Sequence, residues 1–71
     1  MNSTEIRRLR YALDLTQKQF AEKIGVTHLS ISRWERSETV PTQLAMYKLL
    51  EMKKEYDERN PVRERSRPTD N

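Results

Sequence analysis

The stretch of sequence that decides the fold runs from residue 15 to residue 41 and reads LTQKQFAEKIGVTHLSISRWERSETVP. Thr16 opens a Thr-Gln-Lys-Gln run, which fits the capping box of a helix N-terminus. Gly25 ends this segment, because glycine reaches the left-handed backbone of a helix C-terminus without a Cβ clash. Thr27 is a second candidate N-cap. The stretch therefore predicts two short helices, one from Thr16 to Gly25 and one from Thr27 to about Arg36.

The small and apolar residues of this stretch stand in the order of a helix–turn–helix, which we place at residues 17–36. Ala21 is small, as two steeply crossing helices require where they approach each other. Val26 follows the glycine and fills the space under the turn. Ile31 and Trp34 lie three residues apart, at the spacing that meets the preceding helix. The apolar face of that preceding helix consists of Phe20, Ala21 and Ile24.

Two further helices flank this pair, over residues 4–13 and 43–59. The first carries one apolar stripe, at Ile6, Leu9 and Leu13. The second has Thr42 as its N-cap and ends before a proline. Its clearest apolar stripe is Met46, Leu49 and Leu50, with Leu44 and Tyr47 beside it.

The chain is predicted to be all-α, because β-branched alternation is scarce and no Asn-Gly or Asp-Gly hairpin turn occurs. Its 71 residues are enough for one small domain. We expect a compact bundle of four or five helices over residues 1–59. The remaining residues, 60–71, contain two prolines and one apolar residue, and we expect a disordered polar tail there.

Composition argues against most kinds of enzyme. Cysteine is absent, which removes disulfides, thiolate metal sites and cysteine nucleophiles. The single histidine, His28, cannot build a zinc site alone. We therefore expect no metal, no cofactor and no small-molecule ligand. The sequence has no apolar run of about 18 residues and no apolar leader, so we expect a cytoplasmic protein with no membrane partner.

The positive charge is concentrated in the first half of the chain. The net charge is +3. Residues 1–37 contain seven Lys and Arg against four Asp and Glu, whereas residues 38–71 contain seven of each. An excess of cations around the helix–turn–helix points to a polyanionic partner.

At this point the residues resemble the Cro/repressor (Xre) class of helix–turn–helix DNA-binding proteins. The matching elements are Leu-Thr-Gln, Phe-Ala, Ile-Gly-Val, Ile-Ser and Trp-Glu-Arg, followed by a proline after a short loop. The match covers about residues 6–50. It implies a lambda-repressor-like fold and a bacterial or phage transcription regulator that binds operator DNA as a dimer. Two departures stand out: the family commonly has glycine where Ser37 stands, so this residue adopts a strained turn or the turn differs, and its fifth helix has no clear counterpart here.

The resemblance implies base contacts from His28, Leu29, Ser32 and Arg33. These residues share one helix face, at i, i+1, i+4 and i+5. The fork of Arg33 matches guanine O6 and N7, and Leu29 suits a thymine methyl group. His28 and Ser32 both donate and accept hydrogen bonds. The alternatives remain open that His28 is merely an exposed polar residue and that Arg33 pairs with an acid.

Phosphate contacts are expected at the N-termini of the two helices of the helix–turn–helix and in the loop that follows them. The candidates are Gln17, Lys18, Thr27, Arg36, Ser37 and Thr39. Gln17 is alternatively no more than a good helix former. Glu35 is an acid on the predicted DNA-facing helix, and the resemblance implies that it pairs inside the domain with Arg10 on the first helix. Its alternative is two separate solvated charges.

The leading hypothesis is a sequence-specific regulator, a repressor that occupies an inverted-repeat operator in double-stranded DNA through the major groove. We expect a homodimer, because one three-turn helix reads only a few base pairs, with its interface around Leu44, Tyr47 and Met52. The rival is an antitoxin or interaction protein whose C-terminal segment binds a partner protein. Residues 51–71 offer that segment only Met52, Tyr56 and Val62 as apolar anchors, so this interpretation ranks second. An enzyme ranks third.

Overall fold

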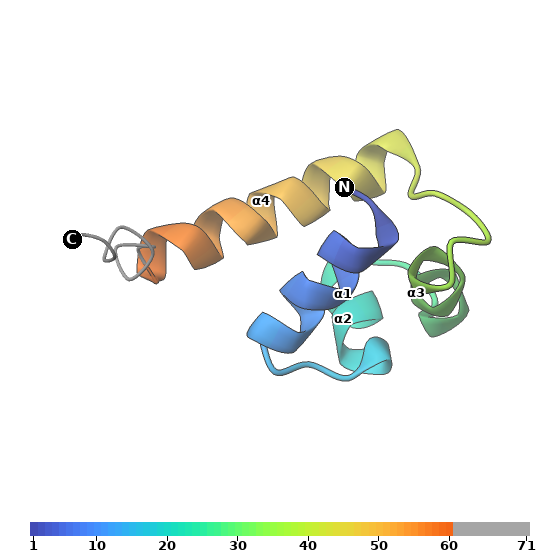
Figure 1. Ribbon diagram of the computed structural model, residues 1–71, viewed down its shortest axis with the longest axis horizontal. Helices are drawn as coiled ribbons and strands as arrows, with labels where there is room; N and C mark the ends of the chain where they lie inside the picture. Colours follow the sequence, from blue (N-terminus) through green and yellow to red (C-terminus); the bar gives the residue numbers. More distant parts are fainter. Residues whose placement is uncertain (61–71) are drawn as a thin grey trace.

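The helices of the computed structural model follow one another in the order α1 (Ser3–Ala12), α2 (Gln17–Ile24), α3 (His28–Glu35) and α4 (Gln43–Arg59) (Figure 1). The structure describes residues 1–60, and within them every regular element is a helix. This confirms the predicted all-α class and helix–turn–helix arrangement. The expected tail, apart from Asn60, lies outside the described residues.

Each helix begins at a side chain that caps it. Asn2, Thr16, Thr27 and Thr42 have extended backbones, and a side-chain oxygen of each accepts a hydrogen bond from the backbone N–H three residues later. A cap of this kind contributes about 1 kcal/mol. At Asn2 and Thr16 the backbone N–H of the capping residue also donates to the side chain of the residue three positions later, which completes a capping box. The helix starts are therefore set by contacts within four residues of chain.

Three helices are followed, within two residues, by a residue with a left-handed backbone. These are Asp14 (φ 59°), Gly25 (φ 91°) and Ser37 (φ 63°). After α3, the Ser37 N–H donates to the Trp34 carbonyl at 3.1 Å, and the Glu38 N–H donates to the Arg33 carbonyl at 2.9 Å. This pair of bonds is a Schellman motif with serine where glycine is usual. The turn has therefore kept its geometry, and Ser37 carries the backbone strain.

One apolar core joins the four helices. α2 packs most extensively against α3, α1 packs against α3, and α4 lies against α2. Phe20, Ile31 and Leu49 are fully buried. The remaining core residues are Ile6, Leu9, Ala21, Ile24, Trp34 and Ala45, and Met1, Leu13, Leu15, Val26 and Met52 pack at the edge.

The apolar stripe predicted for the last helix is wrong in part. Ala45 and Leu49 are the buried residues of α4, and Met52 packs beside them. Leu50, by contrast, is 49% exposed, because α4 touches the bundle along a narrow line at positions i, i+4 and i+7. The second half of α4 runs past the other three helices (Figure 1). Among the described residues, no helix has the length and apolar character needed to cross a membrane.

Candidate nucleic-acid interface

The side of α3 that faces away from the core is polar and open to solvent. His28 and Arg33 are exposed, Leu29 is 47% exposed, and Ser32 is half-buried. On the opposite side, Ile31 and Trp34 are 0% and 5% exposed. The structure thus places the four predicted base-contacting residues on one side of a helix whose other side is buried.

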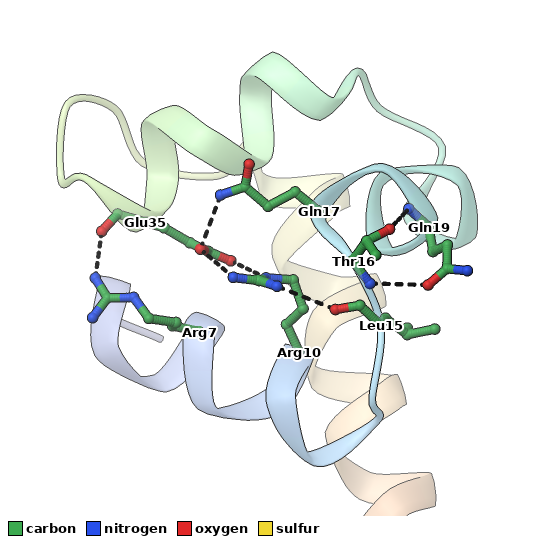
Figure 2. Close-up of polar contacts among 7 residues, drawn as sticks. All are labelled: Arg7, Arg10, Leu15, Thr16, Gln17, Gln19 and Glu35. Atoms are coloured by element: carbon green, nitrogen blue, oxygen red, sulfur yellow. Dashed lines mark hydrogen bonds and ion pairs between the residues drawn. The ribbon is translucent and has the colours of Figure 1, made fainter.

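The buried side of α3 also carries a charge. Glu35 is 6% exposed, and the Arg10 guanidinium holds both of its carboxylate oxygens, with Nε 2.7 Å from Oε2 and Nη2 2.9 Å from Oε1 (Figure 2). The Arg10 side chain is only 11% exposed. A bidentate, largely buried pair of this kind ties α1 to α3 at a fixed angle.

Three further hydrogen bonds extend this contact (Figure 2). Gln17 Nε2 donates to Glu35 Oε1 at 3.2 Å, which brings the start of α2 to the same carboxylate. Arg7 Nη2 donates to the Glu35 carbonyl oxygen at 2.7 Å, and Arg10 Nη1 donates to the Leu15 carbonyl oxygen at 3.1 Å. The end of α3 is therefore anchored to both preceding helices.

The environment of Glu35 pushes its pKa in two directions. Burial raises the pKa, but hydrogen bonds from Arg10 and Gln17 and the charges of Arg10 and Arg7 outweigh it, so the pKa lies below the ordinary value of 4.5. The hydrogen bonds that Arg10 donates to Glu35 in turn raise the pKa of Arg10 further above its already high value. Both groups are therefore charged at neutral pH.

The predicted phosphate-contacting residues near the start of α2 and α3 differ in their exposure and in their contacts within the protein. Lys18 is exposed. Gln17 is half-buried and its amide nitrogen is directed to Glu35. The Thr27 hydroxyl accepts from the Ser30 N–H at 3.2 Å and lies 3.2 Å from the Ser30 hydroxyl, so it serves first as the N-cap of α3.

The loop after α3 contains the other three candidates, Arg36, Ser37 and Thr39, all exposed. The Ser37 hydroxyl donates to the Ser3 hydroxyl at 2.8 Å, which links this loop to the start of α1. Arg36 forms an exposed ion pair with Glu38, and a hydrogen bond from Arg36 holds the pKa of Glu38 below its ordinary value.

Sequence reasoning missed several of these contacts, among them three that involve predicted phosphate-contacting residues. The first is the pairing of Arg36 with Glu38, although the base and the acid stand two residues apart in the printed sequence. The contact of Gln17 with Glu35 and that of Ser37 with Ser3 join residues far apart in the chain. No sequence signal indicates the last two, because they depend on how the helices cross.

Comparison with known proteins identifies the family. A family model described as helix-turn-helix matches residues 6–52. The chain therefore belongs to this family, that of Cro/C1-type, Xre-like helix–turn–helix proteins, which confirms the resemblance seen in the sequence. The protein is a DNA-binding transcription regulator, of a family that is typically non-enzymatic. No curated protein and no solved structure gave a significant match.

The structure also bears on the rival hypothesis, in which a C-terminal segment binds a partner protein. Met52 packs against the protein's own core, and Tyr56 is half-buried. Val62, the third apolar anchor, lies outside the described residues. Met52 is therefore partly used by the protein's own core, and Met52 and Tyr56 both line a cavity of about 620 Å³ beside Leu13 and Leu15.

Proposed function

We propose that this protein is a repressor that binds an inverted-repeat operator as a homodimer, with α3 in the major groove of the DNA. The observation that carries the proposal is the exposed polar side of α3 on a helix held from behind by Glu35 and Arg10. Repression requires only that the operator be occupied, so the protein needs no cofactor and performs no chemistry.

The base contacts are assigned to the exposed side of α3. An α-helix with its side chains is about 10–12 Å in diameter, which fits the width of the major groove, about 12 Å. Arg33 is assigned to a guanine, because its guanidinium can donate to O6 and N7 together. Leu29 is assigned to a thymine methyl group, and His28 and Ser32 to base edges that accept or donate.

The phosphate contacts are assigned to residues around α3. Lys18 at the start of α2 is an exposed cation, and the backbone N–H groups of Gln17 and Lys18 lie in the first turn, where the helix dipole favours an anion. Thr27 lies at the start of α3, and the loop after it contributes Arg36, Ser37 and Thr39. These groups hold the protein in register on DNA but carry no sequence information of their own.

Dimerisation is assigned to α4. Leu44, Tyr47 and Leu50 stand at i, i+3 and i+6, and they are 67%, 60% and 49% exposed. Val40, 83% exposed, precedes them in the loop. Met52, which the sequence analysis placed at this interface, packs in part against the core, so the proposed interface is centred on Leu44, Tyr47 and Leu50. The face is apolar, and its use by a second copy would leave α3 free.

The test separates base contacts from phosphate contacts. An operator is first selected from a random DNA pool, and Arg33→Ala and Lys18→Ala are then titrated on the operator and on scrambled DNA at several salt concentrations. We expect Arg33→Ala to cost about 1–3 kcal/mol on the operator and to relax preference at one base position per half-site. Lys18→Ala should weaken both DNAs alike and make the log–log salt slope shallower by about 0.9.

The matched control is Arg59→Ala at the far end of α4, which removes the same charge from an exposed residue. It measures the effect of net charge alone. If Arg33→Ala and Lys18→Ala behave identically on the two DNAs, α3 does not read the bases and the proposed function is wrong.

A further inference from the structure

The side chain of Arg36, one of the proposed phosphate contacts, is held by groups of the protein itself. Its Nε and Nη2 donate to the two carboxylate oxygens of Glu38, at 2.9 and 3.2 Å. Its Nη1 donates to the hydroxyl of Ser32, one of the proposed base contacts. Arg36 and Glu38 remain 52% and 51% exposed, so incoming DNA can reach both.

The backbone keeps Glu38 where it can hold Arg36. Glu38 follows the left-handed Ser37, and its N–H is bonded to the Arg33 carbonyl at 2.9 Å. The Ser37 hydroxyl is bonded to Ser3 on α1 at 2.8 Å. The loop is therefore fixed to α3 and to α1. This placement of the loop keeps the Glu38 carboxylate close to Arg36.

Glu38 places a negative charge among the proposed phosphate contacts. Glu35, the acid before it, is buried and turned to Arg10, whereas Glu38 is exposed. Between Arg36 and Thr42, Glu38 is the only acid in the sequence. A surface that is to meet phosphates thus carries a carboxylate bound to one of its own cations.

We propose that Glu38 attenuates DNA binding, because its carboxylate competes with DNA phosphate for the guanidinium of Arg36. This inference rests on the proposed function, in which α3 reads DNA. On non-specific DNA, where contact is loose and dominated by the backbone, Arg36 stays paired with Glu38 and releases no counterion. On the operator, the base contacts of α3 hold the loop against the sugar–phosphate backbone of the DNA, so Arg36 moves to a phosphate. This movement leaves the Ser32 hydroxyl free to contact a base.

The test compares Glu38→Gln with Glu55→Gln, which removes the same charge from an exposed residue in the second half of α4. On scrambled DNA, we expect Glu38→Gln to tighten binding beyond the control by roughly fivefold to tenfold near 0.1 M salt and to steepen the salt slope by about 0.9, the contribution of one phosphate contact. On the operator the gain beyond the control should be at least as large, because the variant no longer has to break the Arg36–Glu38 pair, and the salt slope should be unchanged. The ratio of operator to scrambled affinity should therefore stay equal or rise, and only the scrambled DNA should show the change in salt slope.

A double variant shows whether the effect acts through Arg36. In an Arg36→Ala background, Glu38→Gln should gain no more than Glu55→Gln gains. If Glu38→Gln matches Glu55→Gln in the native background, Glu38 does not compete for Arg36. If it weakens binding, Glu38 positions Arg36 for phosphate, and the inference is overturned. If one of these results is found but Arg33→Ala still weakens operator binding, the inference about Glu38 is wrong and the proposed function stands. If Arg33→Ala does not weaken operator binding, both the proposed function and the inference are wrong.

Discussion

At the scale of single residues, three helix C-termini use the same left-handed backbone with three different side chains. Gly25 adopts it at no steric cost, whereas Asp14 and Ser37 have a Cβ that the conformation disfavours. Ser37 gains a partial compensation in its hydrogen bond to Ser3. The conformation is retained because the two Schellman hydrogen bonds after α3 require it.

Ser37→Gly is therefore expected to stabilise the protein by about 0.5–1 kcal/mol, because relief of the backbone strain outweighs removal of the exposed hydrogen bond to Ser3. For a domain of this size that raises Tm by a few degrees, at about 4–8 °C per kcal/mol. Thermal unfolding followed by circular dichroism measures the shift. Ser37→Ala, which keeps the strain and removes the hydrogen bond, should lower Tm, and a Ser37→Gly variant that also melts lower would contradict the strain.

At the scale of the elements, Glu35 joins three helices through one side chain. Its carboxylate contacts Arg10 of α1 and Gln17 of α2, and its carbonyl accepts from Arg7. The helices involved have eight to ten residues and would be marginal alone. The crossing angles that present α3 therefore depend on this buried polar contact as well as on the apolar core.

Glu35→Gln is expected to destabilise the fold by about 3–5 kcal/mol, because it leaves the largely buried Arg10 charge without its partner. Urea unfolding at neutral pH measures the change in free energy, and Glu22→Gln, at an exposed acid on α2, is the control that should have little effect. An unfolding midpoint equal to that of the native protein would mean that the pair contributes nothing in solution.

The pH dependence of stability provides a second expectation for the same residue. The pKa of Glu35 is lowered on folding, so its stabilising contribution is complete above the ordinary value of 4.5 and disappears as pH falls through the lower folded value. The native protein should lose stability in that acid range. Glu35→Gln should show a smaller decrease there, measured by urea unfolding at a series of pH values. Parallel pH profiles for the two proteins would refute the assignment.

At the scale of the whole molecule, the protein presents two different surfaces. The outer side of α3 carries the exposed Arg33 and is mostly polar, whereas the outer side of α4 is apolar at Leu44, Tyr47 and Leu50. One α3 reads only a few base pairs, and two copies related by a two-fold axis would read half-sites about 34–36 Å apart. In the proposed function the first surface binds DNA and the second binds another copy of the protein.

Leu44→Glu is expected to weaken self-association, because it places a charge in the proposed apolar interface. Sedimentation equilibrium with and without operator DNA measures the change. Leu29→Glu is the matched control, since it places the same charge at another exposed leucine, on α3. The control should leave the mass of the free protein unchanged. A native protein that is monomeric both alone and on the operator would rule out the dimer.

The sequence by itself determined the helix starts, the helix–turn–helix and most of the core. Thr16, Thr27 and Thr42 act on a backbone N–H three residues away, so their effect depends on a few dihedral angles and can be read locally. The pairing of Glu35 with Arg10 was expected from a family resemblance and not from spacing, since 25 residues separate the two.

Only the tertiary structure decided which side of α4 is buried, and which side chains surround the exposed face of α3. Leu49 and Leu50 are adjacent and equally apolar, yet one is fully buried and the other half exposed, because the line of contact with α2 selects between them. The hydrogen bond between Ser37 and Ser3 spans 34 residues and follows from the way α1 crosses α3. Such contacts depend on the relative placement of whole helices, which no local pattern contains.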